Sequence, residues 1–422
     1  MNMNKAVYPL IILLLCMCRL NTSACTTAVV SGKCTVDGRP LLFKQRDATD
    51  FNNRMQLFHD GKYTYMGLCD KKDPKGKEVW GGYNSTGFAI INSASYNLNS
   101  SDSSGVKDQE GFIMKRALQV CATLKDFEIL LDTLAKPMGC NTNFGVIDAH
   151  GGAAYYETGN NGYVKFDAND SVIAKRGYLI RTNFCFTGKS DLDKGLSRYY
   201  AEKEILLGGY ARQILSPEFF LSDVSRSLFH GLTHVNLYNQ MPENDITPFF
   251  VPFRDYILRY STSSALVIQG VSRGEAPSQS VCWTVLGSPL TSVAIPLWII
   301  PSGNLPLILE ADTDGNAPLC KWALTLKESL FPIHSGEGPD YLDLGKLINK
   351  RKNGIMQRTL PVQDSILHRG IAMQERFRKN KSINPEEINA FYNWVNQYVT
   401  DFYTHSFSPY DKSPASPRPG TM

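Results

Sequence analysis

The first apolar stretch of the chain stands directly before a strand-like segment. Residues 6–17 (AVYPLIILLLCM) are mostly apolar, follow the positive charge of Lys5 and lead to small residues at 22–24. This order is typical of a secretory signal, and the run is too short to span a bilayer comfortably. A buried N-terminal helix is the alternative. We expect residues 1–24 to be removed on export, so that the exported chain begins at Cys25.

Beyond Cys25, β-branched or alternating segments are interspersed with helical patterns. The predicted strands lie within residues 26–31, 40–47, 87–95, 144–149, 154–158, 178–184, 264–270 and 281–300. A helix is predicted from Thr123, which opens a T-x-x-D capping pattern followed by apolar residues at helical spacing from Phe127 to Leu134. From about Asp340 the pattern becomes helical and more polar. The sequence therefore indicates a mixed α and β core.

Composition and length limit the classes of protein that fit. An apolar share of 43% and a charged share of 20% are those of an ordinary globular protein, and a net charge of +4 without a long basic run argues against a nucleic-acid partner. No later stretch approaches the length of a membrane span. We expect one core over residues 25–340, a helical extension packed on it over 341–412, and a flexible tail over 413–422. The sequence leaves open whether the protein forms a homo-oligomer.

Metal-ligand patterns are weak in this chain. The ten cysteines are scattered without a C-x-x-C pair, which indicates neither a zinc ribbon nor a dense disulfide scaffold. His230 and His234 stand four residues apart, but the glutamate of an H-E-x-x-H motif is missing and no third ligand is evident. We interpret them as a surface pair and expect no metal site.

A cysteine at a new N-terminus carries two reactive groups. Its thiol is a nucleophile, and its α-amine, with an unperturbed pKa of about 7.7–8.0, is partly unprotonated near neutral pH. The amine of Cys25 could take the thiol proton directly or through a water, without a histidine. Such a site needs a carboxylate to hold the amine and donors for the developing oxyanion.

Strand pairing decides whether a carboxylate lies near Cys25. The turn signal Asp37-Gly38 separates the two strands at 26–31 and 40–47. A two-residue loop there would place Asp47 opposite residue 28 and Asp50 opposite Cys25, whereas a wider loop centred on Val36 would place Asp47 directly opposite Cys25. In either register the end of the second strand returns to the start of the first.

Spaced motifs between residues 25 and 300 resemble one known family. They are CTTAVVSG (25–32), FKQRD (43–47), GYNSTGFAIINSAS (82–95), NFGVID (143–148), RTNF (181–184) and WTVLGSPL (283–290). The chain resembles the N-terminal-nucleophile hydrolases that cleave linear amides, such as bile salt hydrolase and penicillin V acylase, and most closely the secreted C45 acyltransferase-like members. The resemblance implies an α+β fold, a four-layer αββα sandwich with a helical C-terminal appendage.

The resemblance also implies a role for individual residues. Cys25 matches the nucleophile, and Asp47 matches the carboxylate that binds its α-amine. The family arginine three residues before that aspartate is replaced by Lys44, so the site cation is either Lys44 or Arg46, and we favour Arg46 because a guanidinium offers more directed donors.

Three later residues complete the set that the family pattern implies. Asn92 matches the oxyanion asparagine, although its spacing differs from that of the bile salt enzymes. Asn183 matches a second site asparagine, and Arg259 is preferred to Arg273 as the late arginine. Both asparagines could instead be ordinary turn residues.

The implied activity is hydrolysis of a small-molecule N-acyl amide through an acyl-enzyme, without a metal or organic cofactor, in a periplasmic or extracellular protein. Bile-acid amides, penicillins, N-acyl amines and N-acyl amino acids all remain open as substrates, as does acyl transfer to an amine. The alternative is that Cys25 is the lipid-bearing cysteine of a surface lipoprotein with a binding role. Thr22 stands where such signals usually carry an aliphatic residue.

Overall fold

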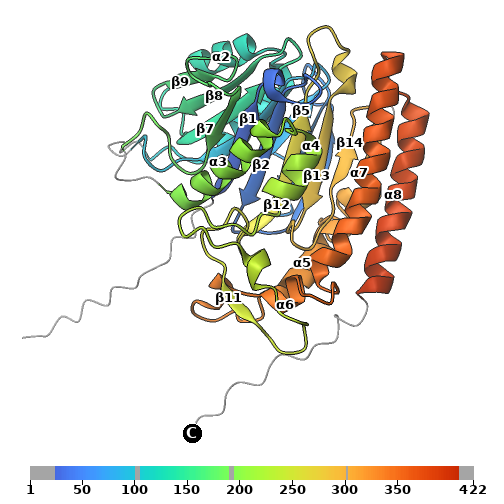
Figure 1. Cartoon of the computed structure of the whole chain (residues 1–422). Helices are drawn as coiled ribbons and strands as arrows, with labels where there is room; N and C mark the ends of the chain where they lie inside the picture. The colour runs from blue at the N-terminus through green and yellow to red at the C-terminus, as the bar shows by residue number, and fades with distance from the viewer. Residues whose placement is uncertain (1–23, 100–104, 190–193, 301–302, 408–422) are drawn as a thin grey trace, which may run out of the picture.

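Two antiparallel sheets pack face to face in the computed structural model, which describes residues 24–99, 105–189, 194–300 and 303–407 (Figure 1). The predicted signal segment and tail lie outside the described residues. The first sheet has the order β10 (Tyr178–Arg181), β1 (Cys25–Val30), β2 (Leu41–Asp47), β12 (Thr262–Gln269), β13 (Val281–Leu286) and β14 (Ile295–Leu297). The second sheet has the order β3 (Asn53–Phe58), β4 (Tyr65–Asp70), β5 (Gly81–Asn84), β6 (Ala89–Ala94), β7 (Thr142–Ile147), β8 (Ala153–Thr158) and β9 (Tyr163–Asp167).

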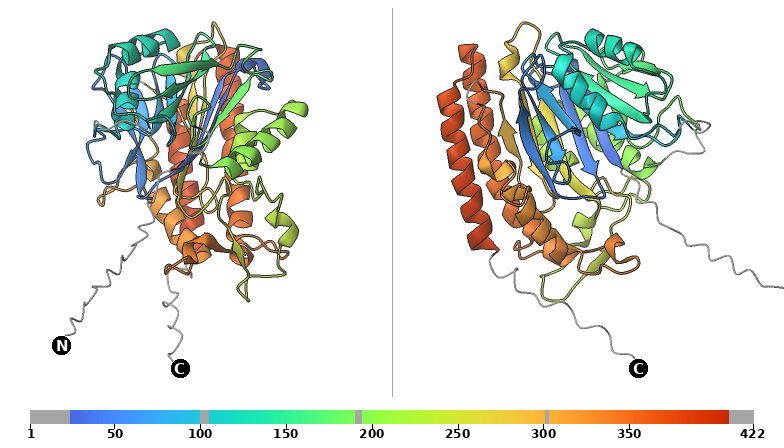
Figure 2. Two further views of the ribbon diagram at one scale, coloured as in Figure 1. Left: turned by 90° about the vertical axis from the view of Figure 1, so that its left-hand side faces the viewer. Right: turned by 180° about the vertical axis from the view of Figure 1, so that it is seen from behind.

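Helices cover the outer face of each sheet (Figures 1 and 2). The second sheet is covered by α1 (Glu110–Val120) and α2 (Leu124–Thr133). The first is covered by α3 (Leu196–Ala211), α4 (Pro217–Phe219), α5 (Pro318–Leu330), α7 (Ile355–Asn380) and α8 (Pro385–Ser406). A short α6 (Leu344–Leu347) follows β15 (Tyr341–Asp343), which pairs with β11 (Phe250–Pro252). The order helix, sheet, sheet, helix is the αββα sandwich that the family resemblance implied.

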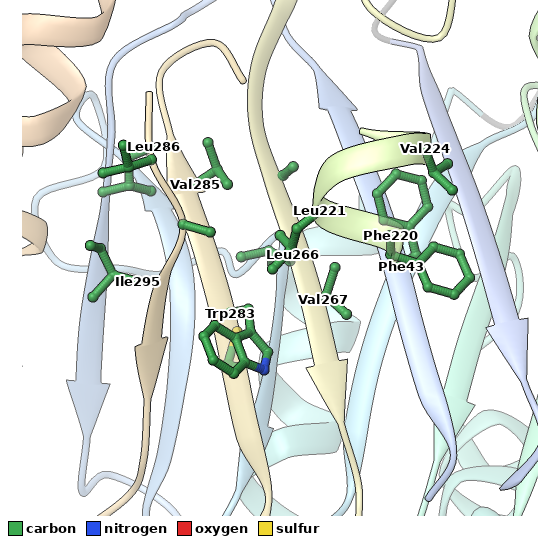
Figure 3. Packing of buried hydrophobic residues seen from close by; sticks show 14 of the residues in the cluster. Phe43, Phe220, Leu221, Val224, Leu266, Val267, Trp283, Val285, Leu286 and Ile295 are labelled. Carbon is green, nitrogen blue, oxygen red and sulfur yellow. The ribbon is translucent and has the colours of Figure 1, made fainter. Parts of the chain in front are cut away.

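Strand alternation sorts the side chains of the first sheet into two sets. On β2, Phe43 faces the helices, and its ring centroid lies 5.3 Å from that of Phe220, in the π-helical turn Phe220–Val224 that follows α4 (Figure 3). Lys44, the next residue, faces the second sheet, where its Nζ reaches Asn92 on β6. Because successive residues alternate between faces, the even positions of β2 line the space between the sheets.

The C-terminal helices bury aromatic side chains against the first sheet. The indole of Trp298 lies 6.1 Å from the ring of Phe377 on α7 and 6.5 Å from that of Tyr392 on α8, measured between centroids. A Cβ at Gly370 would stand 2.7 Å from the Trp283 ring, so α7 needs glycine there to approach β13. Burial of these large rings contributes to the packing of α7 and α8 on the first sheet. No helix among the described residues combines the length and apolarity needed to cross a bilayer.

Most predicted elements are confirmed with shifted ends. Each predicted strand segment contains a strand, and the long run at 281–300 holds two, β13 and β14, separated by a turn in which Gly287 has a φ of 79°. The predicted capping box is present. The hydroxyl of Thr123 accepts from the backbone N–H of Asp126, and the carboxylate of Asp126 accepts from the backbone N–H of Thr123.

The two-residue hairpin loop at Asp37-Gly38 is not formed, and the connection is closer to the wider loop that was the alternative. Residues 31–40 form a longer loop that begins with a 3-10 turn at Gly32–Cys34, capped by Ser31. Backbone N–H groups of this loop donate to carbonyls far along the chain, from Ser31 to Gly177 at 2.7 Å and from Val36 to Leu215 at 3.1 Å. The loop is held by these tertiary contacts and by a local turn in which Gly38 has a φ of 76° and the backbone N–H of Arg39 donates to Asp37 Oδ1 at 3.2 Å.

Candidate active site

Cys25 is the first residue of β1, and its side chain faces the space between the sheets. The phenol of Tyr155 on β8 donates to Thr27 Oγ1 at 2.8 Å, which places Thr27 on the face toward the second sheet. Residues two apart on a strand share a face, so Cys25 lies on it as well. The residue is 5% exposed. The thiol is therefore held at one end of the sandwich, at the start of a central pair of strands.

The register between β1 and β2 differs from both predicted registers. Cys25 pairs with Arg46, and Val30 pairs with Leu41. Asp47 is one position further along, and its backbone N–H donates to the carbonyl of Ala24 at 2.9 Å. The predicted pairing of Asp47 directly opposite Cys25 is wrong by one residue because the loop at 31–40 is held from outside. Asp47 nevertheless lies beside the peptide bond between Ala24 and Cys25.

Lys44 and Asn92 form one buried unit on the Cys25 face. The Lys44 ammonium donates to Asn92 Oδ1 and to the carbonyl of Trp80, both at 2.6 Å, and Asn92 Nδ2 donates to Thr142 Oγ1 at 3.2 Å. With its oxygen taken by Lys44, the Asn92 amide keeps a second N–H for another acceptor. Burial, reinforced by Arg46, lowers the pKa of Lys44 to about 8, although the charges of Cys25 and Asp70 favour the ammonium.

Arg46 shares that face but already has a carboxylate partner. Its guanidinium makes a two-pronged pair with Asp70 of β4, at 2.8 Å and 3.0 Å, and lies 5.1 Å from the centroid of the Trp80 ring. No carboxylate of the described residues forms an ion pair with Lys44, whose hydrogen bonds go to neutral oxygens. The charge of Lys44 is therefore not taken up by a carboxylate of the described residues, whereas Arg46 joins β2 to the second sheet through Asp70.

Asp47 lies on the opposite face of β2 and is surrounded by donors. Both Nε and Nη2 of Arg259 are 2.7 Å from Asp47 Oδ2, and the hydroxyl of Thr262 donates to Oδ1 at 2.7 Å. Burial alone would lower the pKa of Arg259, but the adjacent Asp47 carboxylate outweighs it and raises the pKa. The structure thus brings together Asp47 and Arg259, which lie far apart in the sequence.

Asn183 is linked to Cys25 through an arginine that the sequence did not single out. Arg198 of α3 donates to the Cys25 carbonyl at 2.6 Å, to Thr26 Oγ1 at 3.0 Å and to Asn183 Oδ1 at 2.5 Å. Asn183 Nδ2 in turn donates to the carbonyl of Ala94 at the end of β6. Burial, together with the charge of Arg259, lowers the pKa of Arg198 to about 10. This network fixes the backbone of Cys25.

The residues that sequence reasoning missed are Arg198, Asp70, Thr142 and Thr262. None of the four belongs to a motif quoted above, and they reach the site through pairing of neighbouring strands (Thr142, Thr262), stacking of the sheets (Asp70) or the position of α3 across the sheet (Arg198). Thr262 carried a weak signal, since it follows Arg259 closely in the segment RYSTSSA.

The described residues were also compared with the side-chain clusters that bind metal ions. Within the ranges that the structure describes, no three His, Cys, Asp or Glu side chains gather in a way that could hold a metal ion. The eight cysteines from Cys25 to Cys320 are free thiols in the described residues. His230 lies in a turn, and its Nδ1 is 3.3 Å from the backbone N of Leu232.

Comparison with known proteins gives one family match. Residues 37–206 match the family model of acyl-coenzyme A:6-aminopenicillanic acid acyl-transferase, which is less than half of the chain. The resemblance to the N-terminal-nucleophile amide hydrolases of the C45 acyltransferase type is thereby confirmed. The matched range contains Lys44, Arg46, Asp47, Asn92 and Asn183, but neither Cys25 nor Arg259.

The solved structures that are similar to this chain are distant. An N-acylethanolamine-hydrolyzing acid amidase ortholog from Caenorhabditis elegans is 14% identical with a TM-score of 0.39, covering 58% of this chain and 92% of its own. Penicillin V acylase from Agrobacterium tumefaciens is 14% identical with a TM-score of 0.40, covering 65% and 86%. A mutant conjugated bile acid hydrolase from Clostridium perfringens is 10% identical with a TM-score of 0.35, covering 65% and 92%. No curated protein matches the chain.

Proposed function

We propose that the protein is an exported amide hydrolase in which Cys25, exposed by removal of residues 1–24, attacks a linear C–N amide of an N-acyl compound. The observation that carries the proposal is the convergence on one strand end of a buried thiol, a lysine–asparagine unit without a carboxylate partner among the described residues, and Asp47, whose backbone N–H donates to the carbonyl of Ala24. These are the nucleophile, the oxyanion donors and the amine holder that such chemistry requires.

The reaction would proceed in two halves. Cys25 Sγ attacks the amide carbonyl carbon while its proton passes to the α-amine, and the oxyanion accepts hydrogen bonds from the second N–H of Asn92. The charge of Lys44 stabilises the thiolate before attack and the oxyanion after it. The C–N bond then breaks as the α-amine returns the proton to the leaving nitrogen.

Water completes the cycle. It attacks the thioester carbon, gives a proton to the α-amine, and releases the carboxylic acid together with the regenerated thiol. An amine in place of water would give acyl transfer by the same route. The arrangement around Cys25 is compatible with hydrolysis and with acyl transfer.

The lipoprotein alternative is weakened by the surroundings of Cys25. Cys25 is 5% exposed, and it lies on the same face of the first sheet as Lys44 and Arg46. A thioether-linked lipid at that sulfur would have to displace charged groups from a close-packed interior, which would cost several kcal/mol. The burial therefore favours a nucleophile.

Intact mass of the secreted protein tests the proposal. We expect a chain that starts at Cys25 with no added mass, and a covalent adduct of one acyl group on that residue after brief incubation with an N-acyl amide at low pH, where hydrolysis of the thioester is slowed. A lipid on Cys25, or an acyl adduct on another cysteine, would refute the assignment.

Asp47→Asn tests the amine holder. We expect a rate at least roughly tenfold lower, because a charge-assisted hydrogen bond contributes about 1.5–3 kcal/mol and about 1.4 kcal/mol corresponds to one decade. The variant also leaves Arg259 without its carboxylate partner. The measurement is kcat/KM for an N-acyl amide.

Asp50→Asn is the matched control. Asp50 accepts from the backbone N–H and side-chain amide of Asn52, at 3.0 Å and 3.1 Å, and so serves a local turn. We expect this variant to keep its activity. If it lost activity and Asp47→Asn kept it, Asp50 would be the holder and our assignment would be wrong.

A further inference from the structure

A cavity of about 550 Å³, whose lining does not include Cys25, lies where the edge strands of the two sheets come together. Its walls come from β9, from the segment 172–176, from β10, from Phe186 and from α3. β9 and β10 are the terminal strands of their sheets, so the cavity lies at the side of the sandwich, next to the residues of α3 that line it. The volume is in the range of small-molecule sites.

The wall of this cavity is apolar and partly open to solvent. Phe166, Tyr178 and Tyr199 are half-buried in it, whereas Phe186 is 53% exposed and Val172 is 83% exposed. Large apolar side chains that line a hollow in this way leave surface that an apolar ligand would remove from water.

The charged residues that line the cavity are all cations: Lys165, Lys175, Arg176, Arg181 and Lys203. Arg181 is occupied, since its Nε is 2.7 Å from the buried carboxylate of Glu157 and its guanidinium lies 4.5 Å from the centroid of the Phe186 ring. Lys165 pairs with Glu128 at 2.9 Å.

The remaining three cations, Lys175, Arg176 and Lys203, have no ion-pair partner within the residues described. Lys203 lies 5.8 Å from the centroid of the Tyr200 ring. An apolar hollow bordered by unpaired positive charge and free of carboxylates is complementary to one ligand chemistry, an anionic head on an apolar body.

We propose that this cavity is a binding site for a fatty carboxylate, with the alkyl chain against Phe166 and Phe186 and the carboxylate at Lys175 and Arg176. The site is distinct from the one at Cys25, and the proposal does not depend on the proposed function. The two are neighbours in the fold, since β10 pairs with β1 in the register Arg181 to Thr27. A released acyl product of the right length would be one such ligand.

The proposal is tested by a calorimetric titration of dodecanoate into the full-length protein, with dodecanoate kept below its micelle concentration. We expect saturable binding to one site. The charge-reversed double variant Lys175→Glu/Arg176→Glu should weaken it at least roughly tenfold, because an attraction at two side chains becomes a repulsion. Dodecyltrimethylammonium, which has the same chain with a positive head, should not bind.

Arg351→Glu/Lys352→Glu is the matched control, since these are also an exposed, adjacent Arg and Lys pair in a loop. Thermal unfolding of both double variants checks that each is folded. Ile173→Asp, which puts a carboxylate in the apolar wall, should weaken dodecanoate binding without touching Lys175 or Arg176. The proposal is overturned if dodecanoate fails to bind, if the control pair weakens it as much, or if the cationic surfactant binds as tightly.

Discussion

Replacement of Cys25 by alanine is expected to abolish hydrolysis while leaving the fold intact. The nucleophile forms the covalent intermediate, and without it only binding and oxyanion donors remain, so the rate should fall at least about a thousandfold. Alanine fits the buried position at the start of β1 without overpacking it, and the pairing with Arg46 is through the backbone. The measurements are kcat/KM for an N-acyl amide and the midpoint of thermal unfolding.

Cys34→Ala is the control for this variant. Cys34 is at the other end of the hairpin, in the 3-10 turn, where its Sγ donates to the carbonyls of Ser31 and Gly177 at 3.3 Å. Burial raises the pKa of the Cys34 thiol to about 12, so almost none of it is thiolate near neutral pH. We expect normal activity. A dead Cys34→Ala beside an active Cys25→Ala would show that the nucleophile had been misidentified.

Local rules sufficed for much of the fold. Alternation and β-branched residues placed β1, β2 and β12, and a T-x-x-D pattern placed the start of α2 at the correct residue. These are properties that a strand or a helix end determines within a few residues. The layer order came from the motif resemblance, since nothing in the periodicity of β1 says which sheet will stack on it.

Local sequence rules could not predict the register between β1 and β2 or the partners of the site side chains. The pairing of Cys25 with Arg46 depends on a loop held by Gly177 and Leu215, which are remote in sequence. The wider-loop register is wrong by one residue, a shift that moves side chains to the other face, and the register of the two-residue loop is wrong by four, so both misplaced Asp47 relative to Cys25.

The choice between Lys44 and Arg46 shows why spacing cannot assign a cation. Both lie on the face of Cys25, and the guanidinium has the better donors in isolation. Asp70 takes up the charge of Arg46, however, and that carboxylate belongs to β4 in the opposite sheet. The availability of a charge is decided by its partners, and these become visible only when the two sheets are stacked.

The second large effect is expected from a chain that keeps one extra residue before Cys25. The α-amine is then an amide nitrogen, which cannot accept a proton, and no histidine lies in β1 or β2 to replace it. A general base typically contributes about 10²–10⁴ to the rate, so at least about a hundredfold should be lost. The extra residue must resist removal, and intact mass confirms that it is present.

Two observations separate loss of the base from loss of the fold. The extended chain should unfold at the same temperature as the exported form, because in the structure Ala24 is buried and its carbonyl accepts from Asp47, so a residue before Cys25 is accommodated. Its Cys25 should also still react with a small alkylating reagent at high pH, where the thiol ionises without help. Full hydrolysis by the extended chain would exclude the α-amine as base and would leave Lys44, with its pKa of about 8, as the one amine beside the thiol among the described residues.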